Sequence, residues 1–193
     1  MHSGVITLTS AATETTVPGY EAGTWNIDPI HSEVGFSVRH MMVSKVRGRF
    51  TSFSGQIVTA DDPTKSSVTA EIDLGSINTG QEQRDEHIKS ADFFEVETYP
   101  TMTYKSTGLR VEDGEYVLDG DLTLKGVTKS VPLHLELNGF GPDPYGGVRA
   151  GFTATGEISR SDFNVAFNAP MANGGVVVGD KVTLHLEIEA VRA

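Results

Sequence analysis

A period-two alternation of apolar and polar residues constrains the fold of this chain more than any other feature of its sequence. Residues 68–74, 131–137 and 182–188 show it most clearly, with an apolar residue at almost every second position. Successive side chains of a β-strand point to opposite faces of the sheet, so the pattern is typical of strands with one buried and one exposed face. It continues through most of the chain after residue 23 and predicts an all-β protein of antiparallel strands.

Turn-forming residues divide the alternating segments into about eight strands. Asp, Gly and Pro gather between the strands, for example at 61–63, 112–114 and 139–147. We expect the strands to begin near Thr24, Val46, Ser67, Thr101, Tyr116, Lys129, Val148 and Lys181. Each strand is roughly ten residues long, whereas about five or six is usual.

One segment, residues 81–90, has no alternation and is rich in strong helix formers. Asn78 or Thr79 is expected to cap a short helix there, and Pro100 to stop whatever follows it. Ile88 would form the apolar side of this helix, and the phenylalanines at 93 and 94 would tuck under the sheet.

Eight long amphipathic strands can bury their apolar faces as a sandwich or as a closed barrel. Long strands favour the barrel, whose strands tilt and curl around its axis. We therefore expect an extended eight-stranded antiparallel barrel with one short helix between the third and fourth strands. A barrel of about eight strands is either filled by side chains or just wide enough to hold one small ligand.

The composition narrows the classes of function. A chain of 193 residues is long enough for one domain with a sizeable core; we expect a flexible tail at 1–22 and the barrel domain at 23–193. The absence of cysteine excludes disulfides, thiolate catalysis and Cys-based metal sites. A formal net charge of −11 argues against nucleic acid as a partner and against broad attraction to anionic membranes. A local basic patch and a transient membrane contact stay open.

The N-terminal segment lacks the basic start and sustained apolar run of a signal peptide. No run in the sequence approaches the ~18 apolar residues that a membrane-spanning helix needs. The expected location is the cytoplasm.

Small residues at inward-facing positions of the strands bear on whether the barrel is filled or hollow. They are Gly48, Ala70, Ala150, Ala154 and Gly156. Such residues leave room, and unfilled space costs about 24 cal/mol per Å³, which favours a guest in the lumen. Barrels also alternate large and small side chains to close their ends, so both interpretations stay open.

The strand at 34–38 ends in an unusual turn, His40-Met41-Met42-Val43. Turns are normally polar, whereas methionine is flexible and suits variable apolar surfaces. The turn is interpreted either as the lip of a cavity or as a plain packing contact under the helix.

Candidate polar site residues are few. His31 and His40 lie about nine residues or ~30 Å apart along one strand, so they cannot share a metal unless the strand bends sharply. No His-x-His or His-Glu-x-x-His spacing occurs, and no metal site is predicted. Arg84 and His87 fall within one turn of the predicted helix and either face a polar head group or form a surface cluster. No nucleophile elbow is found either.

Several ordered motifs resemble the YceI-like family of lipid-binding proteins. They include Trp25-Asn-Ile-Asp-Pro-Ile-His31-Ser32, Arg84-Asp85-x-His87-Ile88-Lys89-Ser90-x-Asp92-Phe93-Phe94, Gly120-x-Leu122-Thr123-Leu124-Lys125-Gly126-Val127-Thr128-Lys129 and Arg160-Ser-Asp162-Phe163. The resemblance implies a lipocalin-like barrel that binds polyisoprenoid chains or isoprenoid quinones, with homodimers and no established catalytic activity. Many members are periplasmic and carry a signal peptide, a feature from which this sequence departs.

The resulting hypothesis is a binding protein that sequesters or carries an isoprenoid amphiphile and needs no cofactor. The head group is expected at His40, Arg84 and His87. The apolar lining is expected at Phe36, Val38, Met42, Phe50, Ile72, Leu74, Ile88, Phe93, Phe94, Leu122, Leu124, Leu133, Phe152 and Leu184. The alternatives are an enzyme that acts on a lipid or quinone in the same cavity, and a stress-associated structural protein with a filled barrel.

Overall fold

The computed structural model describes residues 17–193. The strands are β1 Gly23–Ile27, β2 Glu33–His40, β3 Ser44–Phe50, β4 Phe53–Thr59, β5 Ser67–Asp73, β6 Ile77–Asn78, β7 Thr101–Glu112, β8 Glu115–Leu124, β9 Val127–Ser130, β10 Leu133–Pro142, β11 Val148–Ser159 and β12 Val178–Arg192. The helix is α1 Glu82–Lys89, and the short 3-10 turns are η1 Pro63–Lys65, η2 Leu74–Ser76 and η3 Arg160–Phe163.

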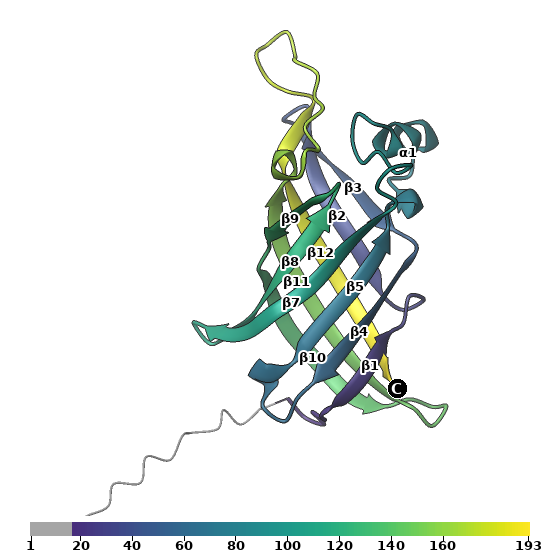
Figure 1. Cartoon of the computed structure of the whole chain (residues 1–193), viewed down its shortest axis with the longest axis vertical. Helices are drawn as coiled ribbons and strands as arrows, with labels where there is room; N and C mark the ends of the chain where they lie inside the picture. The colour runs from purple at the N-terminus through teal and green to yellow at the C-terminus, as the bar shows by residue number, and fades with distance from the viewer. Residues whose placement is uncertain (1–16) are drawn as a thin grey trace, which may run out of the picture.

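The sheet closes on itself as an elongated antiparallel barrel (Figure 1). Its strands follow the order β1-β4-β5-β7-β8-β10-β11-β12, and β12 pairs back onto β1. This closed eight-stranded ring with one helix confirms the predicted fold. Closure leaves no free sheet edge around the ring, which removes a common route to aggregation.

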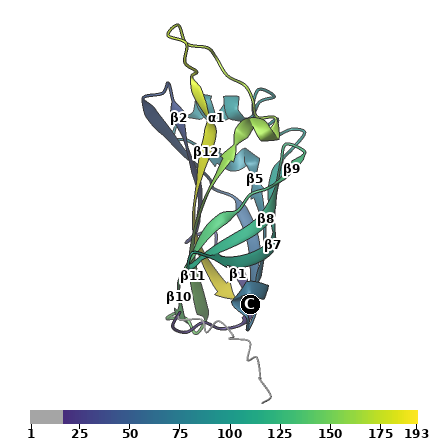
Figure 2. The same cartoon turned by 90° about the vertical axis from the view of Figure 1, so that its left-hand side faces the viewer.

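A bend divides each of two predicted strands into one strand in the ring and one that extends beyond it. The first continues from β1 into β2 after a turn at residues 28–32, and the second runs from β3 into β4. β12 is long enough to pair with β1 through its last residues and with β2 through residues 178–187. The β2–β3 hairpin therefore extends the wall beyond the ring, beside α1 (Figure 2).

The predicted helix is present, but its cap differs from the expected one. Gln81 is the N-cap, and its side chain accepts from the backbone amide of Arg84. Thr79 is engaged elsewhere, because its amide donates to the carboxylate of Asp85 at 2.9 Å. α1 contacts β6, which brings the helix to the upper end of the barrel.

An aromatic cluster fills the lower end. Trp25 is completely buried and its indole N–H donates to the Thr59 hydroxyl at 2.8 Å. The ring of Phe140 meets Trp25 edge-on at 5.4 Å and Tyr20 at 5.2 Å. The predicted tail boundary at residue 22 stays a prediction: residues 1–16 lie outside the described part of the chain, and Tyr20 packs on the barrel.

Across residues 17–193, no helix combines the length and the apolar character needed to cross a bilayer.

Candidate functional site

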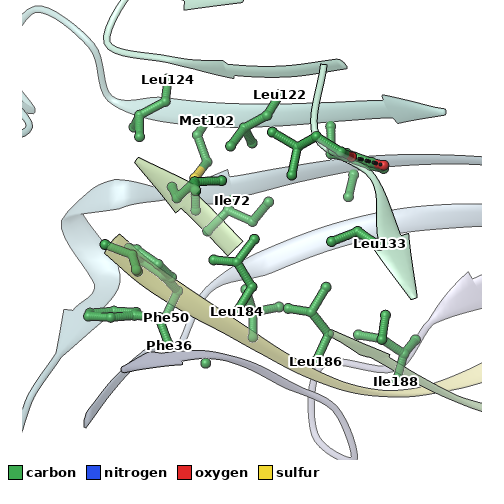
Figure 3. Close-up of a pocket in the computed structure, with 18 of the residues that line it drawn as sticks. Phe36, Phe50, Ile72, Met102, Leu122, Leu124, Leu133, Leu184, Leu186 and Ile188 are labelled. Carbon is green, nitrogen blue, oxygen red and sulfur yellow. Dashed lines mark hydrogen bonds between the residues drawn. The ribbon is translucent and has the colours of Figure 1, made fainter. Parts of the chain in front are cut away.

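An apolar cavity of about 450 Å³ lies inside the barrel (Figure 3). The volume falls within the range of roughly 300–1,000 Å³ that is usual for small-molecule sites. Leucine, isoleucine and phenylalanine side chains from strands on opposite sides of the ring point into it, among them Phe36, Ile72 and Leu184.

The cavity is long and narrow. Along β12 its lining runs from Val178 to Ile188, a span of about 33 Å at ~3.3 Å per residue. A volume of 450 Å³ spread over this length describes a tunnel rather than a round chamber. The lining reaches from His40 at the upper rim to Tyr20 near the aromatic cluster, so the shape suits a linear chain better than a compact ring system.

Most of the predicted lining residues border this tunnel. They are Phe36, Val38, Phe50, Ile72, Ile88, Phe93, Phe94, Leu122, Leu124, Leu133, Phe152 and Leu184. Most of these residues lie on strands and reach the tunnel because β-strand side chains alternate strictly between the two faces. Contact of these side chains with a ligand stays a prediction.

Two predicted lining residues lie outside the tunnel wall. Leu74 shares the parity of Ile72, but β5 ends at Asp73, whose side chain caps η2 by accepting from the amide of Gly75. The chain turns there, and Leu74 is completely buried in the packed core. Met42 sits at the tip of the β2–β3 hairpin and is 57% exposed, so it faces away from the tunnel.

The glycines on the inward face do not themselves leave empty space, contrary to the interpretation that small inward residues leave room in the lumen. A methyl group at Gly48 would lie 2.5 Å from Cζ of Phe36, its cross-strand partner, and one at Gly156 would lie 2.7 Å from Cδ2 of Leu133. Tyr104 covers Gly120 in the same way. Each glycine lets a bulky side chain lie flat against the wall instead of projecting into the lumen, so the tunnel stays open indirectly.

Sequence reasoning missed part of the lining. Val34, Leu186 and Ile188 border the tunnel and share the parity of Phe36 or Leu184, so the same alternation could have identified them. Tyr104 also borders it, and its hydroxyl donates to the carbonyl of Val131 at 2.9 Å. Burial raises the pKa of this hydroxyl well above its ordinary range, so the phenol stays neutral and satisfied.

The three predicted head-group residues all border the upper end of the tunnel. Arg84 is largely engaged, since it donates to the hydroxyl and the carbonyl of Thr79 at 2.7 and 2.8 Å. His87 lies 2.8 Å from a carboxylate oxygen of Asp92 and packs edge-on against Phe93 and Phe167. The structure brings these residues to one rim; head-group binding by them stays a prediction.

Arg160 is a buried cation at this rim that parity could not reveal. Its guanidinium donates to four backbone carbonyls, those of Val165, Phe167, Val178 and Gly179. Burial lowers the pKa of the guanidinium, which still stays charged at neutral pH. It also lies 6.0 Å from the ring centre of Phe93. Arg160 thereby ties the loop after η3 to β12 and orders one side of the mouth.

A second polar cluster lies away from the rim. Ligand-type atoms of Asp28, His31 and Glu189 lie within 4.8 Å of one another. Arg149 occupies the cluster, with Nη1 2.9 Å from Asp28 and 2.6 Å from Glu189. A guanidinium between the carboxylates neutralises them, so the arrangement is that of an ion-pair network joining β11, β12 and the β1–β2 turn.

The sequence of this chain is similar to those of several bacterial proteins. A protein of Photorhabdus laumondii, UPF0312 protein plu2095, is 42% identical over 135 residues, which cover 69% of this chain and 70% of the relative. Protein YceI of Escherichia coli O157:H7 is 37% identical over 163 residues, which cover 84% of this chain and 82% of the relative.

Solved structures share the fold. The crystal structure of BcnA from Burkholderia cenocepacia matches with a TM-score of 0.70 and 26% identity, covering 84% of this chain and 98% of that one. A polyisoprenoid binding domain from Saccharophagus degradans matches in fold with a TM-score of 0.62 and 17% identity, covering 90% of this chain and 100% of that one. The YceI-like domain model matches residues 25–190. The chain therefore belongs to the YceI-like family.

Proposed function

We propose that this protein binds a polyisoprenoid or isoprenoid-quinone-like amphiphile in the barrel and sequesters or carries it. The observation that carries the proposal is the tunnel: about 450 Å³, roughly as long as the described barrel wall, and walled almost throughout by aliphatic and aromatic side chains. The fold shared with a polyisoprenoid binding domain supports the same class of ligand.

The energetics of apolar burial are sufficient for tight binding. A five-carbon isoprene unit offers up to about 4 kcal/mol of transfer free energy, at ~0.8 kcal/mol per carbon group. Association costs an estimated 4–15 kcal/mol, so several buried units exceed it. The polar end of the guest would lie at the rim, near His40, Arg84 and His87.

The polar side chains of the tunnel wall fit a protein that binds a ligand without catalysis. Tyr104 and Arg160 both border the tunnel, but their side chains donate to backbone carbonyls. We propose no cofactor and no metal. A homodimer and a cytoplasmic location remain predictions.

A titration series tests the proposal. Prenyl alcohols of increasing length are titrated into the protein by calorimetry, with straight-chain alkyl sulfates as the comparison. We expect affinity to rise with each isoprene unit until the tunnel is full and then to level off. Binding that ignores chain length, or no binding at any length, would contradict the proposal.

The second candidate is an enzyme that acts on a lipid or quinone in the same tunnel. The His87–Asp92 pair favours it, because a carboxylate 2.8 Å from a histidine orients the imidazole as a general base does. A double variant, His40→Gln with His87→Gln, separates the two candidates. A binder should keep its prenyl affinity within a few fold, whereas an enzyme should lose turnover by about 10² or more.

A further inference from the structure

We propose that the mouth of the tunnel docks onto bilayers that carry anionic lipid headgroups. The docking surface is the rim patch, defined here as Met41, Met42 and Val43 of the β2–β3 hairpin with Phe167 and Val176 of the loop after η3. The biological role of this docking rests on the proposed function, because a carrier must meet the membrane that holds its cargo. The docking itself is separately testable.

The charge of the β2–β3 hairpin opposes that of the rest of the protein. Residues 39–50 hold four cationic side chains, Arg39, Lys45, Arg47 and Arg49, and no acidic one, whereas the whole chain carries a net charge of −11. All four are exposed, and none pairs with an acidic residue in the described range 17–193. Unpaired cations beside an apolar tip are the composition that anionic membrane surfaces attract.

The loop on the other side of the mouth carries no charge. Residues 163–179 contain no Asp, Glu, Lys or Arg. Phe167 and Val176 in this loop are exposed. A headgroup layer could therefore approach this side of the mouth without desolvating a charged side chain.

The apolar tip of the hairpin is unusually open to solvent. Val43 is 82% exposed, and Met41 beside it is also exposed. The hairpin tip and the uncharged loop form one surface: the amide of Met41 donates to the carbonyl of Val177 at 2.8 Å, and a side chain at Gly175 would lie 3.5 Å from Cγ of Met42. Both lie at the upper end of the long axis (Figure 1), where His40, Phe167 and Val177 border the tunnel.

The backbone of the tip is poorly suited to its residues. Met41 and Met42 have φ values of 51° and 64°, and the amide of Val43 donates to the carbonyl of His40 at 3.2 Å. Two central residues in this left-handed region form a turn that favours Asn-Gly, since each ordinary residue there is strained. Backbone strain of this kind is concentrated at functional segments, and here it is borne by two methionines at the tip.

Acidic groups near the mouth are mostly engaged. On α1, Asp85 accepts from Thr79, and Glu86 pairs with Lys89 at 2.8 Å. Asp180, which follows the uncharged loop, accepts from the amide of Ser161 at 3.0 Å. Glu82 and, in η3, Asp162 are exposed, so the cationic surface at the mouth is that of the hairpin, whose residues 39–50 hold no acidic side chain.

The test is co-sedimentation with vesicles of pure phosphatidylcholine and of phosphatidylcholine with about a third phosphatidylglycerol, at ~0.1 M salt. The wild-type protein should bind the anionic vesicles and lose binding at high salt. Lys45→Gln with Arg47→Gln should weaken partitioning about 30-fold, since each cation is worth about 1 kcal/mol near such a surface and ~1.4 kcal/mol is tenfold. Lys65→Gln with Lys105→Gln removes the same charge elsewhere and should change it less than about twofold.

The apolar contribution has its own variants. Val43→Ser should weaken binding about tenfold, whereas Ile30→Ser, at an equally exposed residue (84%) in the β1–β2 turn, should not. Met41→Asn with Met42→Gly installs the residues that the turn favours, so it should keep or raise Tm while vesicle binding falls. This variant separates docking from folding.

The proposal is overturned if the wild-type protein ignores anionic vesicles, or if the control variants lose as much binding as the rim variants. It is also overturned if the rim variants instead dissolve a dimer, which would make the patch an interface between copies. Prenyl-alcohol uptake reports the proposed function separately: rim variants should retain it, and its absence alongside intact vesicle binding would refute only that function.

Discussion

At the scale of single residues, the tunnel depends on which side chains lie flat against the wall. Phe36 covers Gly48 on the neighbouring strand, so its ring stays out of the lumen. Parity analysis identified both as inward-facing but could not tell whether glycine leaves a void or accommodates a neighbour, because that depends on the rotamer of the partner. The sequence was therefore sufficient to predict which residues face the lumen, but not the rotamers that their side chains adopt.

Gly48→Ala tests this packing. The new methyl group would force the Phe36 ring toward the lumen, so we expect a loss of about 1–3 kcal/mol in the free energy of unfolding and a clear drop in prenyl affinity. Gly108→Ala is the control, since nothing lies within 4 Å of the added methyl group there. Chemical denaturation and calorimetry measure both effects, and equal behaviour of the two variants would contradict the account.

Asp28 provides a pH-dependent contribution. Its hydrogen bond to His31, followed by that to Arg149, lowers the pKa of the carboxyl well below its usual range. A lowered folded-state pKa stabilises the protein above the unfolded-state pKa of about 4 and ceases to do so as the pH falls toward the folded value. We expect Asp28→Asn to cost on the order of 1 kcal/mol at pH 7, a fall in Tm of about 2–4 °C. The difference from the wild-type protein should shrink below about pH 4; a difference that stays constant in melts down to pH 2 would refute the assignment.

At the scale of elements, the mouth is formed by segments that alternation does not describe. The helix and the loop after η3 meet through Phe167, whose ring lies 5.2 Å from His87 and 5.3 Å from Phe93. Arg160 holds the same loop through backbone carbonyls. The ring contacts of Phe167 join segments more than seventy residues apart, and the hydrogen bonds of Arg160 depend on the path of an irregular loop. No local pattern in the sequence predicts either, so Arg160 appeared only within a family motif.

Phe167→Ala should weaken the contact between the helix side of the mouth and the loop after η3. We expect the release rate of a fluorescent prenyl probe to rise several fold, with little change in Tm because the ring is already 39% exposed. Stopped-flow transfer to an acceptor measures the rate. Tyr145→Ala, at an exposed ring on the β10–β11 turn, is the control, and equal release rates in all three proteins would show that Phe167 does not restrain the guest.

At the scale of the whole molecule, the barrel is asymmetric along its axis. Trp25 and Phe140 pack the lower end, whereas the upper end carries the helix, the uncharged loop and the rim patch. Alternation, strand length and turn spacing were enough to predict the closed eight-stranded ring, because each strand must bury one face. The bends between β1 and β2 and between β3 and β4 were not predicted, since they depend on long-range pairing: β12 pairs with both β1 and β2, β3 pairs with β2, and β4 pairs with β1.

Blocking the tunnel midway tests its continuity. Ala154 is buried opposite Leu186 and Leu135, and Ala154→Phe would place a ring across the lumen. We expect a cost of about 1–3 kcal/mol in stability and binding of short prenyl alcohols only. Calorimetry over the chain-length series measures the cutoff, and unchanged affinity for the longest chains would contradict a single continuous tunnel.

The proposed function requires the hollow barrel to shelter a long hydrocarbon chain. Native mass spectrometry of the protein purified from its own cells, with identification of the released lipid, tests it most directly. We expect one isoprenoid molecule bound per barrel and its loss from the Ala154→Phe variant. Protein that repeatedly shows only the apo mass, and takes up no prenyl lipid when one is supplied, would contradict it.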